Sequence, residues 1–127
     1  MAKLFSFFIA LFLTTLLYAQ KVKEIDVKAF ESGIQADNSQ LIDARTPGEY
    51  EEGHLKGAKL MDWKDQKKFS KASKELDKSK PVYVYCLVGA RSYDAAEWLS
   101  KQGFSSVYSL KGGIKEWQSE GKPVVKP

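Results

Sequence analysis

The chain alternates between short apolar runs and longer segments in which apolar residues recur at helical spacing. The run PVYVYC, from Pro81 to Cys86, is the clearest predicted strand, because it is rich in β-branched and aromatic residues. In the segment RSYDAAEWLSKQGF that follows, Ala95, Ala96 and Leu99 fall on one face of a helix, which Gly103 is expected to end. This pair of elements sets the pattern for the rest of the chain.

The other predicted elements repeat that order of strand and helix. Residues 23–34 are expected to form a strand and then a helix capped by Asp26. Further strands are expected within 40–46, 58–63 and 105–110, and further helices within 65–76 and 112–121. Residues 46–54, TPGEYEEGH, are expected to form turns, because Pro47, Gly48 and Gly53 interrupt both periods. Strands that alternate with helices predict an α/β fold, a three-layer α/β/α domain with a central, mostly parallel sheet.

The start of the chain, MAKLFSFFIALFLTTLLYAQ, has a different character. A basic Lys3, an apolar stretch from Leu4 to Tyr18 and a small Ala19 form the pattern of a secretory signal peptide. The apolar stretch is shorter than the roughly 20 residues that span a bilayer. Residues 1–19 are therefore expected to be a cleaved signal peptide rather than a membrane anchor. We accordingly expect a periplasmic or secreted protein that keeps no stable membrane anchor after cleavage.

Length and charge place limits on the class of protein. The chain has 127 residues and a net charge of +4, and the part after the leader has the length of one domain, expected over residues 23–125. Lysines concentrate between Lys64 and Lys80, but Glu75 and Asp77 lie among them. We therefore expect a solvated helix face there and no nucleic-acid partner. A mild basic excess favours small anionic substrates. Separately, we expect the protein to be a monomer.

Cys86 is the only cysteine of the chain, so no disulfide can form within it. It ends the clearest predicted strand, and Arg91 begins the next helix, at the edge of a parallel sheet where ligands bind. The loop from Leu87 to Ala90 presents amide groups without helical partners, and the helix dipole and Arg91 add positive charge. This arrangement favours a thiolate and predicts a reactive Cys86, with a packed, inert cysteine as the alternative.

Four segments of the chain, taken in order, carry a resemblance to a known family. They are LIDART with its Asp43 and Arg45, EYEEGHLKGA, VYCLVGARS and LKGGIKEWQSEGKPV. In this order and spacing they are similar to the single-domain rhodaneses, sulfurtransferases of the thiosulfate type, over about residues 23–125. The resemblance implies a rhodanese-like fold in which Cys86 takes a sulfane sulfur, becomes a persulfide and passes the sulfur to cyanide, a small thiol or a protein thiol. It implies no metal and no organic cofactor.

The resemblance also assigns roles to residues around Cys86. It implies a catalytic role for Cys86 and a substrate-binding role for the loop residues Leu87, Val88, Gly89, Ala90 and Arg91, which would hold a small sulfur-containing anion or a persulfide. Val88 is apolar where loops of the family often carry a polar residue, which favours a less polar persulfide or a protein donor over thiosulfate. Asp43 and Arg45 are expected to support the site, either as an ion pair that locks the following loop or as part of the pocket rim.

Three other functions are weighed against sulfur transfer. Related phosphatases and arsenate reductases on this fold use a longer loop than the six residues from Cys86 to Arg91, so a bound sulfur atom is favoured over an oxyanion. A non-catalytic binding module with this fold usually lacks the cysteine. A single-cysteine thiol-redox protein in the cell envelope would need an external thiol to resolve its mixed disulfide.

The remaining polar and aromatic residues are expected to be structural. His54, the lone histidine, is expected to hydrogen-bond a turn rather than act as a general base. Trp98 and Trp117 fall at core positions of predicted helices. The three glutamates near the predicted turn are expected to be solvated; they are Glu49, Glu51 and Glu52.

Overall fold

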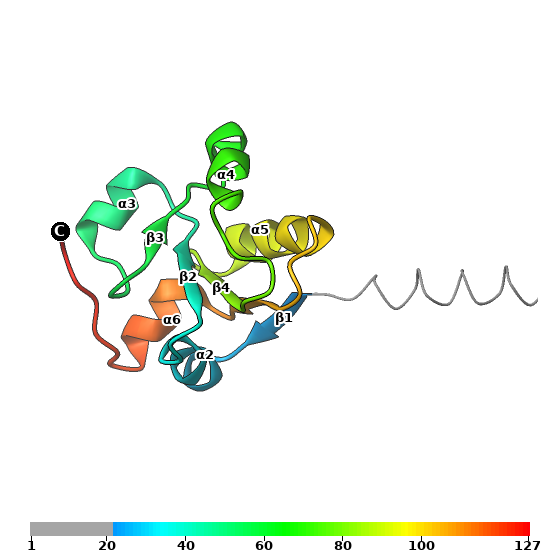
Figure 1. Cartoon of the computed structure of the whole chain (residues 1–127). Helices are drawn as coiled ribbons and strands as arrows, with labels where there is room; N and C mark the ends of the chain where they lie inside the picture. Colours follow the sequence, from blue (N-terminus) through cyan, green and yellow to red (C-terminus); the bar gives the residue numbers. More distant parts are fainter. Residues whose placement is uncertain (1–21) are drawn as a thin grey trace, which may run out of the picture.

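The computed structural model describes residues 22–127 and shows a parallel β-sheet covered by helices (Figure 1). The strands are β1 (Val22–Ile25), β2 (Gln40–Asp43), β3 (Lys59–Leu60), β4 (Val82–Tyr85) and β5 (Val107–Leu110). Their spatial order is β1-β5-β4-β2-β3, and every neighbouring pair is parallel. The predicted signal peptide, residues 1–19, lies outside the described residues.

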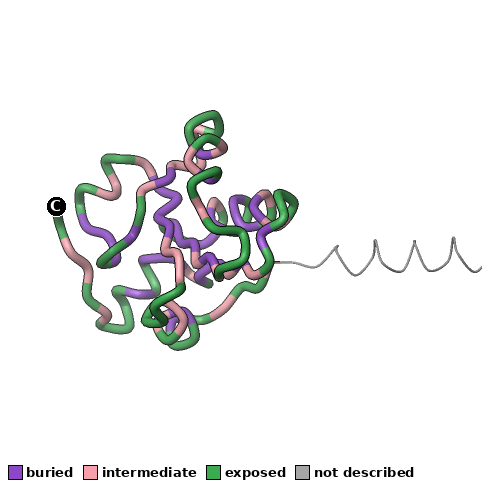
Figure 2. Tube along the Cα trace, in the orientation of Figure 1, coloured by how far each residue is buried: buried purple, intermediate pink, exposed green. Residues whose placement is uncertain are grey.

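Helices cover both faces of the sheet. They are α2 (Val27–Ile34), α3 (Pro47–Glu52), α4 (Gln66–Ser73), α5 (Ala90–Lys101) and α6 (Gly113–Ser119). On one face, Val82 and Val84 of β4 pack with residues of α4 and α5. On the other face, Tyr83 and Tyr85 pack with α2 and α6. The expected three-layer α/β/α fold is therefore confirmed. In Figure 2 the buried segments gather in the middle of the domain and the exposed ones lie mostly at its periphery.

The apolar residues of β4 explain why this strand lies in the interior of the sheet. Successive side chains of a strand point to opposite faces, so apolar residues at every position suit a strand that is buried on both sides. β4 lies between β2 and β5, where both of its edges are hydrogen-bonded. Its carboxyl end therefore meets the carboxyl ends of both neighbours, and Cys86 follows directly.

The prediction of turns over residues 46–54 is wrong for part of that segment. Thr46 accepts a hydrogen bond from the Glu49 amide, the Glu49 carboxylate accepts one from the Thr46 amide, and Pro47 stands at the first helical position. This reciprocal capping box satisfies amide groups that the helix start leaves unpaired. The short helix α3 forms where Pro47 and Gly48 alone suggested a turn.

The predicted strand over residues 58–63 is shortened to the two residues of β3 at the edge of the sheet. Beyond Leu60 the chain still follows β2, because the Met61 amide donates to the Asp43 carbonyl and the Trp63 amide to the Ala44 carbonyl. Among residues 22–127, no helix combines the length and apolar character needed to cross a membrane.

Candidate active site

Cys86 lies at the carboxyl end of β4, directly before the loop that leads into α5. Its side chain is 1% exposed, and the Gly89 amide donates a hydrogen bond of 3.1 Å to the sulfur. Gly89 also serves as the N-cap of α5, with φ at 112°, a left-handed conformation that favours glycine. The loop therefore curls back over the sulfur and presents it with an amide N–H at the positive end of a twelve-residue helix.

Two serines place hydroxyl groups behind the sulfur. The Cys86 thiol donates to Ser92 Oγ at 3.4 Å, and Ser92 Oγ donates to the Gly89 carbonyl at 3.1 Å. Ser92 Oγ also lies 2.8 Å from Ser109 Oγ of β5. Both serines are completely buried. The pair forms a polar path from the sulfur into the core, because a hydroxyl can exchange its donor and acceptor roles as the sulfur gains or loses its proton.

Arg91 holds the far end of the loop through Glu49 of α3. Its two Nη atoms donate to the two carboxylate oxygens at 2.8 and 2.9 Å. These hydrogen bonds, together with those from Thr46 and against the opposing effect of burial, lower the pKa of Glu49 to about 2. The Glu49 hydrogen bonds likewise raise the pKa of Arg91, against the opposing effect of burial.

The pairing bears on two expectations from the sequence. Arg91 was expected to hold the donor anion or to support the loop, and both of its Nη atoms donate to Glu49. Glu49 was expected to be solvated with its neighbours, and that prediction is wrong, since its side chain is only 25% exposed and is paired on both oxygens. The guanidinium therefore joins the start of α5 to α3.

Asp43 and Arg45 form the ion pair expected from the sequence, in the core beside the site. Arg45 donates to both carboxylate oxygens of Asp43 and to the Gly53 carbonyl. The Tyr85 hydroxyl donates to Asp43 at 2.6 Å and accepts from the Leu55 amide. Burial raises the pKa of Tyr85, and the Asp43 carboxylate raises it further. The network joins the ends of β2 and β4 to the loop that follows α3.

Gly113 lets the start of α6 pack against the sulfur loop. The Ile114 amide donates to the Cys86 carbonyl and the Lys115 amide to the Leu87 carbonyl, at 2.9 and 3.1 Å. Gly113 has φ at 62°, and a Cβ there would collide with the Leu87 carbonyl. The carbonyls of Cys86 and Leu87 are therefore satisfied by α6, while the Gly89 amide donates to the sulfur.

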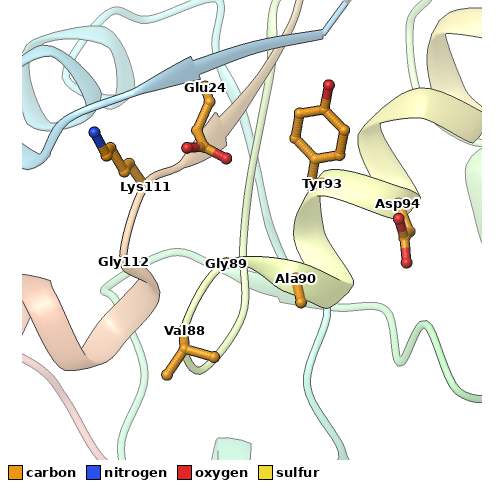
Figure 3. A pocket seen from close by; sticks show the side chains of 8 residues that line it. All are labelled: Glu24, Val88, Gly89, Ala90, Tyr93, Asp94, Lys111 and Gly112. Carbon is orange, nitrogen blue, oxygen red and sulfur yellow. The ribbon is translucent and has the colours of Figure 1, made fainter.

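A cavity of about 470 Å³ adjoins the loop on the side of β1 and β5. Figure 3 shows the side chains that surround it, and its lining residues are Glu24, Val88, Gly89, Ala90, Tyr93, Asp94, Lys111 and Gly112. Val88 is 55% exposed at its mouth, whereas Cys86 stays beneath the loop. The loop thus separates a buried sulfur from an accessible hollow.

The other singled-out residues are structural. His54 was expected to make a structural hydrogen bond, and its Nδ1 lies 3.0 Å from the Tyr50 carbonyl. Its ring also stacks on the ring of Tyr50. Trp117 is buried in one core layer, and Trp98 packs against the other beside Phe69. Residues 22–127 contain no group of three or more His, Cys, Asp or Glu side chains arranged to hold a metal ion.

Some residues at the site had no role in the sequence prediction. Ser92 contacts the sulfur and Ser109 contacts Ser92, Glu49 holds Arg91, and Gly113 packs against the loop. Glu49 had a readable signal, because TPGE matches a capping box. Ser109 interrupts the apolar positions of a buried strand, which marks a polar partner in the core.

Comparison with known proteins shows the family and the fold of the chain. The family model of the rhodanese-like domain matches residues 26–120. The chain is 36% identical over 115 residues to the uncharacterized protein YqhL of Bacillus subtilis, which covers 90% of this chain and 87% of that protein. It is 34% identical over 107 residues to a sulfurtransferase of Allochromatium vinosum, covering 84% of this chain and 97% of the other.

Two solved structures are similar over most of their length. A rhodanese-related protein of Thermoplasma volcanium superposes with a TM-score of 0.72 at 28% identity, covering 83% of this chain and 99% of the other. A rhodanese-like domain of an Anabaena protein gives a TM-score of 0.72 at 29% identity, with coverages of 82% and 79%.

Proposed function

Since the chain belongs to the family of rhodanese-like domains, we propose that it is a sulfurtransferase that carries sulfur on Cys86. A relative named sulfurtransferase covers most of this chain, which supports that class of activity. The observation that carries the proposal is the Gly89 amide 3.1 Å from the Cys86 sulfur, at the start of α5. An amide donor and a helix N-terminus favour a negatively charged sulfur, both before and after it takes up a second one.

The reaction has two steps in this proposal. The Cys86 thiolate attacks the outer sulfur of the donor, the bond from that sulfur to the rest of the donor breaks, and the leaving group departs with the electron pair. Cys86 then carries a terminal persulfide anion. An acceptor such as cyanide or a thiolate attacks the terminal sulfur, the S–S bond breaks, and its electron pair returns to the Cys86 sulfur.

The residues around Cys86 have separate tasks in this scheme. The amides of the loop stabilise the anionic terminal sulfur, because fixed N–H dipoles need no reorganisation as charge moves. Ser92 orients the inner sulfur through its hydroxyl. Arg91 and Glu49 keep α3 and α5 in register around the loop, and Asp43 with Arg45 holds the neighbouring strand end.

Intact mass after incubation with a sulfane-sulfur donor tests the proposal. The expected result is a gain of one sulfur, which cyanide removes with release of thiocyanate and which Cys86→Ser abolishes. The donors should include thiosulfate and an organic thiosulfonate, so that the choice of donor does not decide the outcome. A thiol that reacts with iodoacetamide but takes no sulfur from any donor would contradict the proposal.

We further propose that the protein acts as a monomer after export to the periplasm or the medium. The export rests on the sequence of residues 1–19. Amino-terminal sequencing of the protein recovered from its native cell envelope or medium tests it. A first residue at Gln20 is expected, and an intact Met1 would contradict it.

A further inference from the structure

Residues 122–125 follow α6 and run toward α3 (Figure 1), and we call them the tail segment. Val125 and His54 form an isolated antiparallel bridge, in which each amide donates to the other carbonyl, at 2.8 and 2.9 Å. His54 lies two residues after Glu52, the last residue of α3. The bridge therefore attaches the tail segment to the chain that leaves α3.

The other end of the tail segment is attached to α6 and α2. The Trp117 indole of α6 donates to the Pro123 carbonyl at 2.8 Å, and the Lys122 ammonium group pairs with Glu31 of α2 at 3.0 Å. Val124 packs against the core layer that contains Trp117. The tail segment thus connects α6 to the end of α3 and fixes the position of one with respect to the other.

These two helices support the sulfur loop from two sides. The start of α6 donates two amides to the carbonyls of Cys86 and Leu87. α3 holds the far end of the loop, because Glu49 accepts two hydrogen bonds from Arg91. α3 has six residues and no fully buried side chain. A helix this short gains little stability from its own hydrogen bonds, so its position depends on contacts such as those at its two ends.

Building on the sulfur transfer proposed above, we propose that the tail segment is a positioning element for that reaction. It holds the end of α3, and α3 holds Arg91, so that the loop keeps the Gly89 amide against the Cys86 sulfur. None of residues 122–125 lines the cavity beside the loop or hydrogen-bonds to Cys86. Release of the tail segment lets α3 shift, and the sulfur then loses part of the fixed dipole that stabilises its negative charge.

Three single variants separate the bridge from the side chain that carries it. Val125→Pro removes the amide that donates to the His54 carbonyl, because proline has no N–H group. Val125→Ala shortens the same side chain but keeps the amide, and it is the matched control. Lys126→Pro places the ring one residue further along, at an amide that makes no backbone hydrogen bond within residues 22–127.

Sulfur uptake from methanethiosulfonate measures the effect on the reaction. The Cys86 thiolate takes the outer sulfur, and methanesulfinate leaves with the electron pair of the S–S bond. At a temperature where all variants are folded, Val125→Pro should lower the maximal rate of uptake about fivefold and change the half-saturating donor concentration by less than about twofold. Val125→Ala and Lys126→Pro should keep the native rate. A lower Tm with a native rate in Val125→Pro would show that the bridge contributes only to stability, and would overturn the inference.

A double-mutant cycle tests the connection through Glu49. Glu49→Ala removes both acceptors of Arg91 and should itself slow uptake. Adding Val125→Pro to Glu49→Ala should slow uptake further by less than about twofold, because the connection to Arg91 is already lost. A further loss of about fivefold in that background would show that the tail segment acts independently of Glu49, against the inference.

Hydrogen exchange follows the same connection without any sulfur donor. The His54 amide reports on the bridge, and the Gly89 amide reports on the loop because it donates to the Cys86 sulfur. Both amides should exchange about fivefold faster in Val125→Pro than in Val125→Ala. Faster exchange at His54 with native exchange at Gly89 would show that release of the tail segment does not reach the loop, and the inference would be wrong.

The outcomes distinguish this inference from the proposed function. Sulfur uptake by the native protein with an equal maximal rate in Val125→Pro would overturn the inference while sulfur transfer stands. Failure of the native protein to take up sulfur from any donor would overturn sulfur transfer, and with it the positioning role, whether or not exchange at Gly89 changes.

Discussion

Glu49 and Arg91 are joined by two hydrogen bonds, 2.8 and 2.9 Å long, across the gap between α3 and α5. The residues are 42 positions apart in the chain, so the pair links the sulfur loop to a helix that lies much earlier in the sequence. Because Arg91 ends the loop and Glu49 also caps its own helix, the pair couples the start of both helices.

The ion pair should make stability depend on acid. The pKa of Glu49 is lowered from 4.5 to about 2 in the folded protein. A lowered pKa contributes stability that is complete above the ordinary value and is lost as the pH falls toward the folded value. Glu49→Gln should therefore cost about 1–2 kcal/mol at pH 7, after allowance for partial exposure, and the difference from the native protein should shrink between pH 5 and about 2.

Urea unfolding at a series of pH values measures that difference. Glu51→Gln, an exposed change on the same helix, is the control and should differ little from the native protein at any pH. A constant cost for Glu49→Gln across the acidic range would show that the carboxylate charge contributes nothing.

Removing the Ser92 hydroxyl should slow sulfur uptake by about tenfold. Ser92→Ala leaves the Cys86 sulfur without its hydroxyl partner and the Gly89 carbonyl with the Tyr93 amide alone as donor. The buried Ser109 hydroxyl also loses its partner, and these losses should cost about 1–3 kcal/mol of stability. The rate of persulfide formation from a saturating donor, measured by quenched-flow and mass spectrometry, checks the effect on kcat.

Ser109→Ala is the matched control for Ser92. It removes the hydroxyl that lies 2.8 Å from Ser92 but does not touch the sulfur. It should cost a similar stability and slow uptake much less. Equal rates for the two variants would mean that Ser92 acts only through the packing of the core.

The fold could be predicted from the sequence because the apolar pattern of each segment agrees with the way the structure buries it. PVYVYC is apolar on both faces, and the structure buries β4 on both faces between two strands. Asp26, expected as a cap, accepts from the Ala29 amide. In these segments local preference and tertiary packing point to the same element, which is the condition under which patterns predict well.

The sequence predicts the position of Cys86 better than it predicts the residues that surround it. The strand end, the loop and the helix start are consecutive in the chain, so sequence alone placed Cys86, Gly89 and Arg91 together. The contacts of Glu49 and Ser109 with this site depend on how separate elements pack. α3 forms for a local reason, because the Thr46–Glu49 capping box outweighs the turn preference of Pro47 and Gly48.

Tyr85 should contribute to stability through its hydroxyl alone. Tyr85→Phe keeps the ring in the core but removes the donor to Asp43 and leaves the buried Leu55 amide unpaired, at a cost of about 2–3 kcal/mol. Tyr83→Phe, on the same strand with a partly exposed ring, should cost less than about 0.5 kcal/mol. Thermal unfolding of the two variants provides the comparison, and equal costs would contradict the role of the Asp43 network.

Gly113 offers the sharpest test of how the loop is supported. Gly113 and Gly121 both have positive φ, at 62° and 77°, but a Cβ on Gly121 would meet open space and one on Gly113 would strike the Leu87 carbonyl. Gly121→Ala should therefore cost only the left-handed conformation, about 1 kcal/mol. Gly113→Ala should cost about 2–4 kcal/mol and also displace the loop, because backbone atoms cannot move aside as a flexible side chain does.

The two glycine variants separate strain from loop geometry when stability and sulfur loading are measured together. Gly121→Ala should load sulfur on Cys86 at the native rate at a temperature where both variants are folded. Gly113→Ala should load it at least about tenfold more slowly, because the Gly89 amide no longer reaches the sulfur with the same geometry. Native loading by a folded Gly113→Ala would show that the position of the loop tolerates displacement, and the amide contact would then lose its place in the proposed mechanism.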